Sequence, residues 1–340
     1  MVEWDNRILL VRGWNDGMIG EVHTGIYRLR LPVPGALRSI NSFLLKGREG
    51  WSVIDAGPPL PKCKEQWETA IEDLGIQFTD IKQILITHGH IDHVGLAGWL
   101  QEKSGAKVIM TEDEYKQAFY PDETEQVGSL YYQDGMLSLG IKAEEIEQMT
   151  AILRFATVIP EPWPEVQFLE EKSIEFGDRP WEVVLTTGHT NAHVCLFNRE
   201  DRLLLSGDQI LPTISTVIRF PTRVDDNPLE QYLDSLNRLL QLNPAWIMPA
   251  HGEPFDDLDA RIDQLYKHHE ERLGLIKSCM GNEPRIVRAI VNELFGSGLD
   301  VFNLFLATGE VTAHLLMMAS QGQVQIDRDP NNNQLYFSLV

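Results

Sequence analysis

Three histidines and an aspartate lie within six consecutive positions, His88, His90, Asp92 and His93, in the stretch THGHIDHVGL. The preceding residues QILIT have the apolar pattern of a buried strand, so the cluster begins where a strand ends. In extended backbone, side chains two positions apart point the same way, which lets His88 and His90 converge on one point. The chain then turns into a helix, so Asp92 and His93 can face a second point nearby. These imidazole and carboxylate groups predict a site for zinc, iron or manganese.

Three further potential metal ligands follow, each directly after a predicted strand. His189 follows WEVVLTTG, Asp208 follows RLLLSG, and His251 follows AWIMPA. A single histidine is more often a structural residue than a ligand, but seven such side chains at strand ends indicate one shared metal centre. The sequence does not select zinc over iron or manganese.

The elements that must position these residues alternate between strands and helices. Short strands ended by glycine or proline fill the first 60 residues, and buried-type strands recur later in the chain. We expect helices at about 62–74, 93–103 and 258–280, and strands at 82–87, 106–110, 181–187, 193–198, 202–207 and 245–250. A further helix between the last two strands has apolar Leu229, Leu233, Leu236 and Leu240 on one face. The alternation predicts an α/β layered domain over residues 1–280.

Two segments depart from this alternation. Residues 111–164 are rich in Glu, Gln, Tyr and Met and predict a helical insertion, either a lid over the site or a packing excursion on the surface. Within it, Tyr131 and Tyr132 could reach a substrate or could serve in packing. Residues 281–340 predict helices followed by a β-hairpin, the outline of a winged-helix-like module. That module has three Arg, no Lys and six acidic residues, so packing or formation of a homodimer is favoured over DNA binding.

The composition limits the partners. The net charge of −21 disfavours broad nucleic-acid binding, although a local basic groove remains compatible with it. The three cysteines are too few for a disulfide framework, and the N-terminus does not read as a secretory signal. No continuous apolar run reaches the roughly 18 residues of a membrane span. We therefore expect a cytoplasmic protein without a membrane partner.

The four motifs THGHIDH, GHTNAH, SGD and PAHGEP, in that order, resemble those of the metallo-β-lactamase superfamily over about residues 20–260. The resemblance implies an αββα sandwich with a dinuclear metal centre, most simply two zinc ions, at one edge of two sheets. By position it assigns His88, His90 and His189 to the first ion and Asp92, His93 and His251 to the second, with Asp208 bridging both. Asp55 in VIDAG matches an aspartate that orients the ligand loops from behind, although it could also be a plain turn residue. His193 matches a histidine that is usually not a ligand.

The resemblance also implies an enzyme, a metal-dependent hydrolase. Two cations sharing a water lower its pKa, so that a bridging hydroxide attacks an ester-like bond while Asp92 orients it and moves a proton. A small thioester or lactone is the preferred substrate class, because it fits the acidic surface. An endoribonuclease or phosphodiesterase of the same fold, an iron-dependent sulfur dioxygenase and a non-catalytic relative remain alternatives. Arg219 or Arg223 could hold an anionic substrate group, or both could be plain surface residues; His268 and His269 read as solvent-facing.

Overall fold

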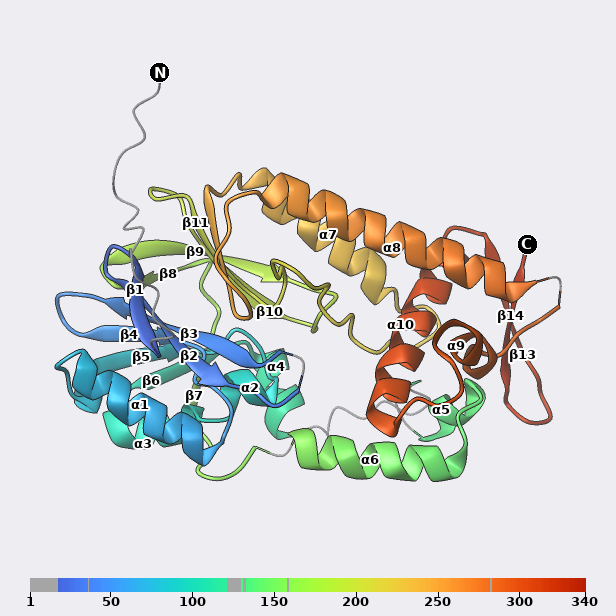
Figure 1. The fold of residues 1–340 in the computed structure, drawn as a ribbon, viewed down its shortest axis with the longest axis horizontal. Helices are drawn as coiled ribbons and strands as arrows, with labels where there is room; N and C mark the ends of the chain where they lie inside the picture. Colours follow the sequence, from blue (N-terminus) through green and yellow to red (C-terminus); the bar gives the residue numbers. More distant parts are fainter. Residues whose placement is uncertain (1–17, 36, 121–129, 131–132, 158, 282) are drawn as a thin grey trace, which may run out of the picture.

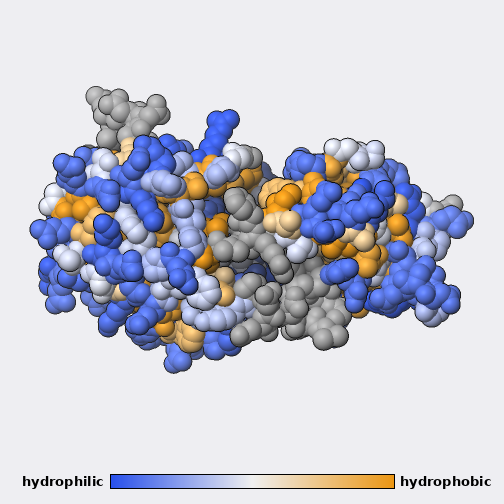
Figure 2. Space-filling view, turned by 90° about the horizontal axis from the view of Figure 1, so that it is seen from below, coloured by the Kyte–Doolittle hydropathy of each residue, from blue (hydrophilic) through white to orange (hydrophobic). Residues whose placement is uncertain are grey.

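The computed structural model describes residues 18–35, 37–120, 130, 133–157, 159–281 and 283–340. Two β-sheets lie face to face with helices on their outer faces, and a smaller helical lobe adjoins them (Figure 1). Seen from below, hydrophilic residues cover most of the visible surface of the described residues (Figure 2). The αββα sandwich predicted from the motifs is confirmed.

The first sheet has seven strands in chain order, of which β4, β5, β6 and β7 run parallel. The strands are β1 (Ile19–His23), β2 (Ile26–Pro32), β3 (Ser39–Lys46), β4 (Trp51–Ile54), β5 (Ile81–Leu85), β6 (Lys107–Met110) and β7 (Val166–Phe168). The helices α1 (Pro61–Asp73) and α3 (Ala97–Ser104) cover its outer face. Trp67 of α1 is fully buried there and donates its indole N–H to the carbonyl of Ala56, which ties the helix to the end of β4.

The second sheet has five strands in the order β12-β11-β10-β9-β8. They are β8 (Ser173–Phe176), β9 (Arg179–Thr186), β10 (His193–Asn198), β11 (Leu203–Gly207) and β12 (Trp246–Pro249). The helices α7 (Pro228–Gln241) and α8 (Leu258–Met280) cover it. Leu229 and Leu236 of α7 are fully buried, as the apolar spacing predicts, and so is Leu239. Each such burial contributes about 1.5–3 kcal/mol.

The smaller lobe joins two parts of the chain that are far apart in sequence. One hydrophobic cluster combines α5 (Gln133–Ser138), α6 (Ala143–Thr157), the end of α8, α9 (Val287–Phe295), α10 (Val301–Ser320), β13 (Val324–Arg328) and β14 (Leu335–Leu339). The helices and hairpin predicted after residue 281 are present, and much of the predicted insertion packs against them. The division of the chain at residue 280 stays a prediction, because the same apolar cluster extends across that boundary.

Helix α10 is, within the described ranges, the one helix with the length and hydropathy that could span a membrane. Of its apolar window, 61% is buried inside the protein. Leu304, Val311 and Leu315 belong to the hydrophobic cluster of the smaller lobe. The apolar character of α10 is therefore that of a core helix.

The expectation that His269 faces solvent is wrong. His269 on α8 is 3% exposed and its Nδ1 lies 3.2 Å from Nε2 of His314 on α10, while the ring of Tyr232 on α7 packs beside it. Burial, with the neighbouring His314 and Arg272, lowers the pKa of His269 to about 3, and burial lowers the pKa of His314 to about 4. Apolar helix surfaces on both sides of α8 leave this position no access to water.

We predict that this histidine pair makes the protein acid-sensitive. In the unfolded chain a histidine has a pKa near 6.5, so the unfolded histidines bind protons at pH values at which the folded pair stays neutral. With respect to this pair, the free energy of unfolding is highest above about pH 6.5 and decreases progressively as the pH falls toward the folded pKa values. The variant H269Q, followed by denaturant unfolding from pH 7 to pH 4.5, should lose stability less steeply than wild type.

The control is H268Q, one position along the same helix, where the side chain is partly exposed. It should keep the wild-type slope. Identical slopes for H269Q, H268Q and wild type would contradict the prediction.

Candidate metal centre

The seven candidate ligands lie at one edge of the sandwich because the strand ends that carry them meet there. The parallel strands β4 and β5 end before Asp55 and His88, and the parallel strands β11 and β12 end before Asp208 and His251. The end of β9 leads to His189 at the same edge. The carboxyl ends of parallel neighbours share a sheet edge, so residues far apart in the chain converge there.

The first cluster consists of His88, His90, His189 and Asp208. Nε2 of His88 lies 2.8 Å from Nδ1 of His90 and 3.3 Å from Nε2 of His189. Nε2 of His189 lies 3.6 Å from Oδ2 of Asp208. The four ligand atoms all lie within 4.8 Å of one another, close enough to surround one ion.

The second cluster consists of Asp92, His93 and His251 and shares Asp208 with the first. Nε2 of His251 lies 3.4 Å from Oδ2 of Asp92 and 3.4 Å from Oδ1 of Asp208. Nε2 of His93 lies 3.5 Å from the same Asp208 oxygen. One carboxylate oxygen of Asp208 thus faces each cluster, which is the arrangement expected of a bridging carboxylate.

Unsatisfied polar atoms show that these residues suit cations. Nε2 of His93, Nε2 of His251 and Oδ1 of Asp208 are buried without a hydrogen-bond partner. Buried polar atoms are rarely left unpaired in proteins, and each one left so costs free energy. A divalent cation would satisfy all three, and nitrogen-rich donors with carboxylates match zinc or iron.

Hydrogen bonds on the outer side fix three of the imidazole rings. Nδ1 of His93 lies 2.8 Å from Oδ2 of Asp55, Nδ1 of His251 lies 2.7 Å from the Ser39 carbonyl, and Nδ1 of His189 lies 2.8 Å from the Val217 carbonyl. An oxygen acceptor at Nδ1 holds a proton there, so Nε2 is the nitrogen that would bind a cation in the cluster. Asp55 is therefore more than a turn residue, although its φ of 62° shows that it also makes the turn.

The two clusters differ in protonation. Burial and the neighbouring histidines lower the pKa of His88 well below its usual value, and burial with His90 lowers the pKa of His189 to about 4. Burial alone would also lower the pKa of His251, but Asp208 and Asp92 raise it to about 10. Burial would raise the pKa of Asp208, but His251 and His93 hold it well below its usual value.

Access to the clusters is uneven. His88 and His93 are fully buried, whereas Asp92 keeps 16% of its side chain exposed and His90 is the most open residue of the first cluster. A substrate can therefore approach from the side of His90 and Asp92.

Sequence reasoning missed two residues that touch this centre from behind. The hydroxyl and backbone N–H of Thr87 donate to Asp55, and the carboxylate of Glu114 accepts from the backbone of two ligand loops. Thr87 follows the strand directly, which is a usable signal. Glu114 lies in the acidic run TEDE, and no pattern separates it from its exposed neighbours.

His193 is buried, and its Nε2 accepts a hydrogen bond from the Asp208 backbone N–H at 3.1 Å. It lies outside both clusters, as expected, and steadies the loop that carries Asp208.

The suggested substrate arginines are engaged within their own loop. Arg219 and Arg223 each make a two-pronged ion pair, with Asp226 and Asp225 respectively. This pairing does not favour either one as an anion-binding group. Tyr131 and Tyr132 lie outside the described residues.

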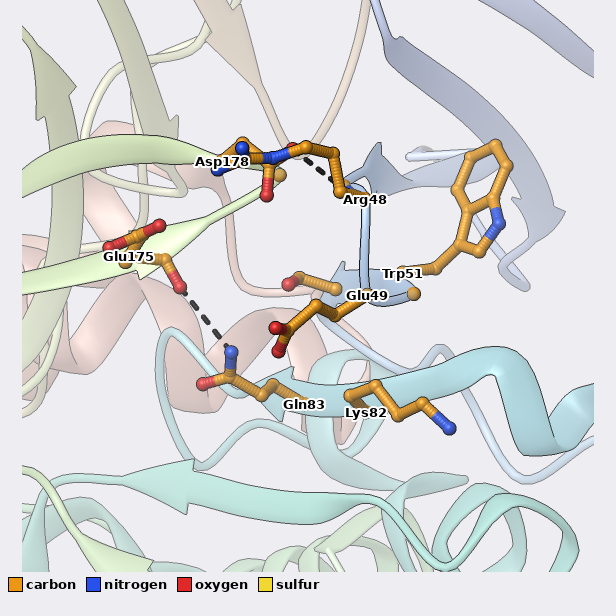
Figure 3. A pocket seen from close by; sticks show the side chains of 11 residues that line it. Arg48, Glu49, Trp51, Lys82, Gln83, Glu175 and Asp178 are labelled. Carbon is orange, nitrogen blue, oxygen red and sulfur yellow. Dashed lines mark hydrogen bonds and ion pairs between the residues drawn. The ribbon is translucent and has the colours of Figure 1, made fainter.

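A hollow lies at the end of the sandwich opposite the metal centre (Figure 3). It has a volume of about 560 Å³ and is lined near the beginnings of β4 and β5 by residues that include Trp51 and Gln83. The Gln83 amide donates to the Glu175 carbonyl, and Arg48 pairs with Asp178. None of the seven candidate ligands lines this hollow, so it is separate from the metal centre.

Comparison with known proteins agrees with this geometry. Residues 35–251 match the metallo-beta-lactamase superfamily. The chain belongs to that superfamily. The matched range contains all seven candidate ligands, so the superfamily domain and the clusters coincide.

Individual relatives support the same placement. The probable metallo-hydrolase YqjP of Bacillus subtilis is 24% identical over 327 residues, covering 93% of this chain and 98% of that protein. A beta-lactamase domain protein from Burkholderia ambifaria has a structure that aligns with a TM-score of 0.78 at 29% identity, over 95% of this chain and 93% of that one. The atrochrysone carboxyl ACP thioesterase of Aspergillus fumigatus is more distant, 22% identical over 75% of this chain and 64% of that protein. Its family membership and its relatives thus identify the chain as a metallo-hydrolase.

We predict that Asp55 strengthens metal binding through His93. The variant D55N keeps the size and the positive φ that asparagine tolerates, but it removes the charge opposite Nδ1 of His93. Loss of such an outer partner typically weakens metal affinity by about 10–100-fold. Competition between the metal-free protein and a chromophoric zinc chelator measures this change.

The matched control is D178N, because Asp178 has a similar φ of 58° and an arginine partner at the far end of the sandwich. It should bind zinc as wild type does. Equal affinities for D55N and D178N would show that Asp55 has no such role.

Proposed function

We propose that this protein is a dinuclear-metal-dependent hydrolase that cleaves an ester-like bond in a small thioester or lactone. The observation that carries the proposal is the pair of abutting clusters with Asp208 between them, each of a size and composition that suits a divalent cation. His88, His90 and His189 would hold one ion, Asp92, His93 and His251 the other, and Asp208 both. We further propose zinc as the metal, since nitrogen donors predominate.

When bound, two divalent cations supply activation of water near neutral pH and polarisation of the carbonyl oxygen under attack. The protein's own residues do the rest. Asp92, the more exposed carboxylate, lies where it can accept a hydrogen bond from the attacking water and carry its proton to the leaving group. Asp55, Ser39 and Val217 hold the imidazoles in the tautomer that keeps Nε2 facing the cations.

A small thioester or lactone is supported by three observations. The net charge of −21 repels polyanions. Arg219 and Arg223, in the loop after Asp208, already pair with aspartates. The same loop exposes Ile214 and Val217, 48% and 51% accessible, and the Val217 carbonyl contacts His189. These apolar side chains beside the cluster suit an acyl group better than a phosphodiester backbone.

A relative's name points the same way. A protein named for a thioesterase activity on an acyl carrier protein covers 75% of this chain in alignment. We also place the protein in a reducing cytoplasm, a proposal that agrees with three buried free cysteines.

We predict that metal-loaded protein hydrolyses a thioester or a lactone from a panel of both classes, and that D208A loses this turnover by more than about 100-fold. Removing the shared carboxylate affects both ions, and outer partners alone account for 10–100-fold. Steady-state kinetics after reloading with zinc, iron(II) or manganese measures both the substrate and the metal.

The control is D201A. Asp201 is partly exposed, pairs with Arg179 and lies just before the strand that leads to Asp208, so D201A should retain wild-type kcat/KM. Circular dichroism confirms that D208A is folded. Undiminished activity of D208A would overturn the proposal, and salt-sensitive RNA cleavage without thioester or lactone turnover would overturn the substrate class.

A further inference from the structure

The carboxylate of Glu114, on helix α4 (Glu112–Phe119), links two loops of the metal centre that come from different sheets. One carboxylate oxygen accepts the backbone N–H of Gly89 at 2.9 Å, and the other accepts the backbone N–H of Ala192 at 2.8 Å. Gly89 lies between His88 and His90, after the first sheet's β5. Ala192 lies three residues after His189, just before the second sheet's β10.

Glu114 is completely buried, which is unusual for a glutamate. A buried carboxylate is tolerated where charged hydrogen bonds satisfy it, and bonds from backbone N–H to an ionised acceptor are stronger than neutral ones. Both oxygens have such a donor, so the side chain is fixed at both ends. Because both bonds go to backbone amides, Glu114 acts on the ligands through the loops that carry them.

Helix α4 packs closely against both loops. A Cβ on Gly89 would lie 2.7 Å from the Glu114 carbonyl and 3.1 Å from Cβ of Ala118, so glycine there allows the close approach. The Thr111 hydroxyl, at the start of α4, donates to the Ala192 carbonyl at 3.1 Å. The first helix of the predicted insertion thus contacts the back of the metal centre and is neither a lid nor a mere surface excursion.

We propose that Glu114 is a positioning residue that sets the distance between the His88–His90 loop and the His189 loop, and so the affinity for the first metal ion. The inference rests on the proposed function, because it assumes that these three histidines hold a cation. It predicts that loss of Glu114 weakens the first ion selectively, since His93 and His251 are held by Asp55 and Ser39 instead.

The test compares E114A and E114Q with wild type in two measurements. The first is amide hydrogen exchange in the metal-free chain, where Gly89 and Ala192 should exchange faster in E114A. The second is removal of zinc by increasing chelator, where E114A should release one of two equivalents at a chelator concentration about 10–100-fold lower than wild type and keep the other. Glutamine offers one acceptor in place of two, so E114Q should fall between.

The matched controls are E112A and E112Q, because Glu112 lies in the same helical turn but is 55% exposed and pairs only across the surface with Lys116. Both should match wild type. A purely structural role would lower the unfolding midpoint without separating the two zinc equivalents, so the separation is the deciding readout.

The outcomes are distinguishable. Unchanged exchange at Gly89 and Ala192 in E114A overturns the inference and leaves the proposed function intact. Faster exchange with both zinc equivalents unaffected, or with both weakened equally, overturns the positioning role. A wild-type chain that binds no zinc overturns the proposed function and this inference with it.

Discussion

The structure depends on the position of one carboxylate, Asp208, between two groups of imidazoles. Burying Asp208 is costly, and in the metal-free protein the charged forms of His93 and His251 offset that cost. On its other side the first cluster gathers neutral nitrogens that face one another at 2.8 and 3.3 Å. A cation among them would bind all three nitrogens at once. Much of the surrounding hydrogen bonding serves to keep these groups in place despite that cost.

The sheets determine where this carboxylate can lie. The parallel pairs β4–β5 and β11–β12 end at one edge, and the apolar layer between the sheets fixes how far apart those ends are. The loops after these strands could still adopt several conformations, and single side chains restrict them to one. Asp55, His193 and Glu114 each connect one ligand loop to another part of the edge.

The sequence was sufficient to predict which side chains meet at this edge, because their chemistry is rare and their position after apolar strands is regular. Strand β10 and helix α8 were predicted at their observed bounds, since uninterrupted apolar or amphipathic patterns define both. Strands β7 and β8 were missed because, at three and four residues, they are too short for a periodic pattern to be recognised. The pattern GEVTAHLLMMASQG predicts a helix that starts at Gly309, but helix α10 begins at Val301, because VFNLFLAT reads equally as a strand or a helix. His269 and Glu114 could not be predicted, since their burial depends on helices that pack from distant parts of the chain.

The central claim is that two metal ions flank Asp208, and anomalous X-ray diffraction from crystals of the zinc-loaded protein tests it most directly. The account predicts two peaks at the zinc edge, one among His88, His90 and His189 and the other among Asp92, His93 and His251, each within coordination distance of Asp208. A single peak remote from Asp208, or zinc-loaded crystals without a peak at this edge of the sandwich, would contradict it.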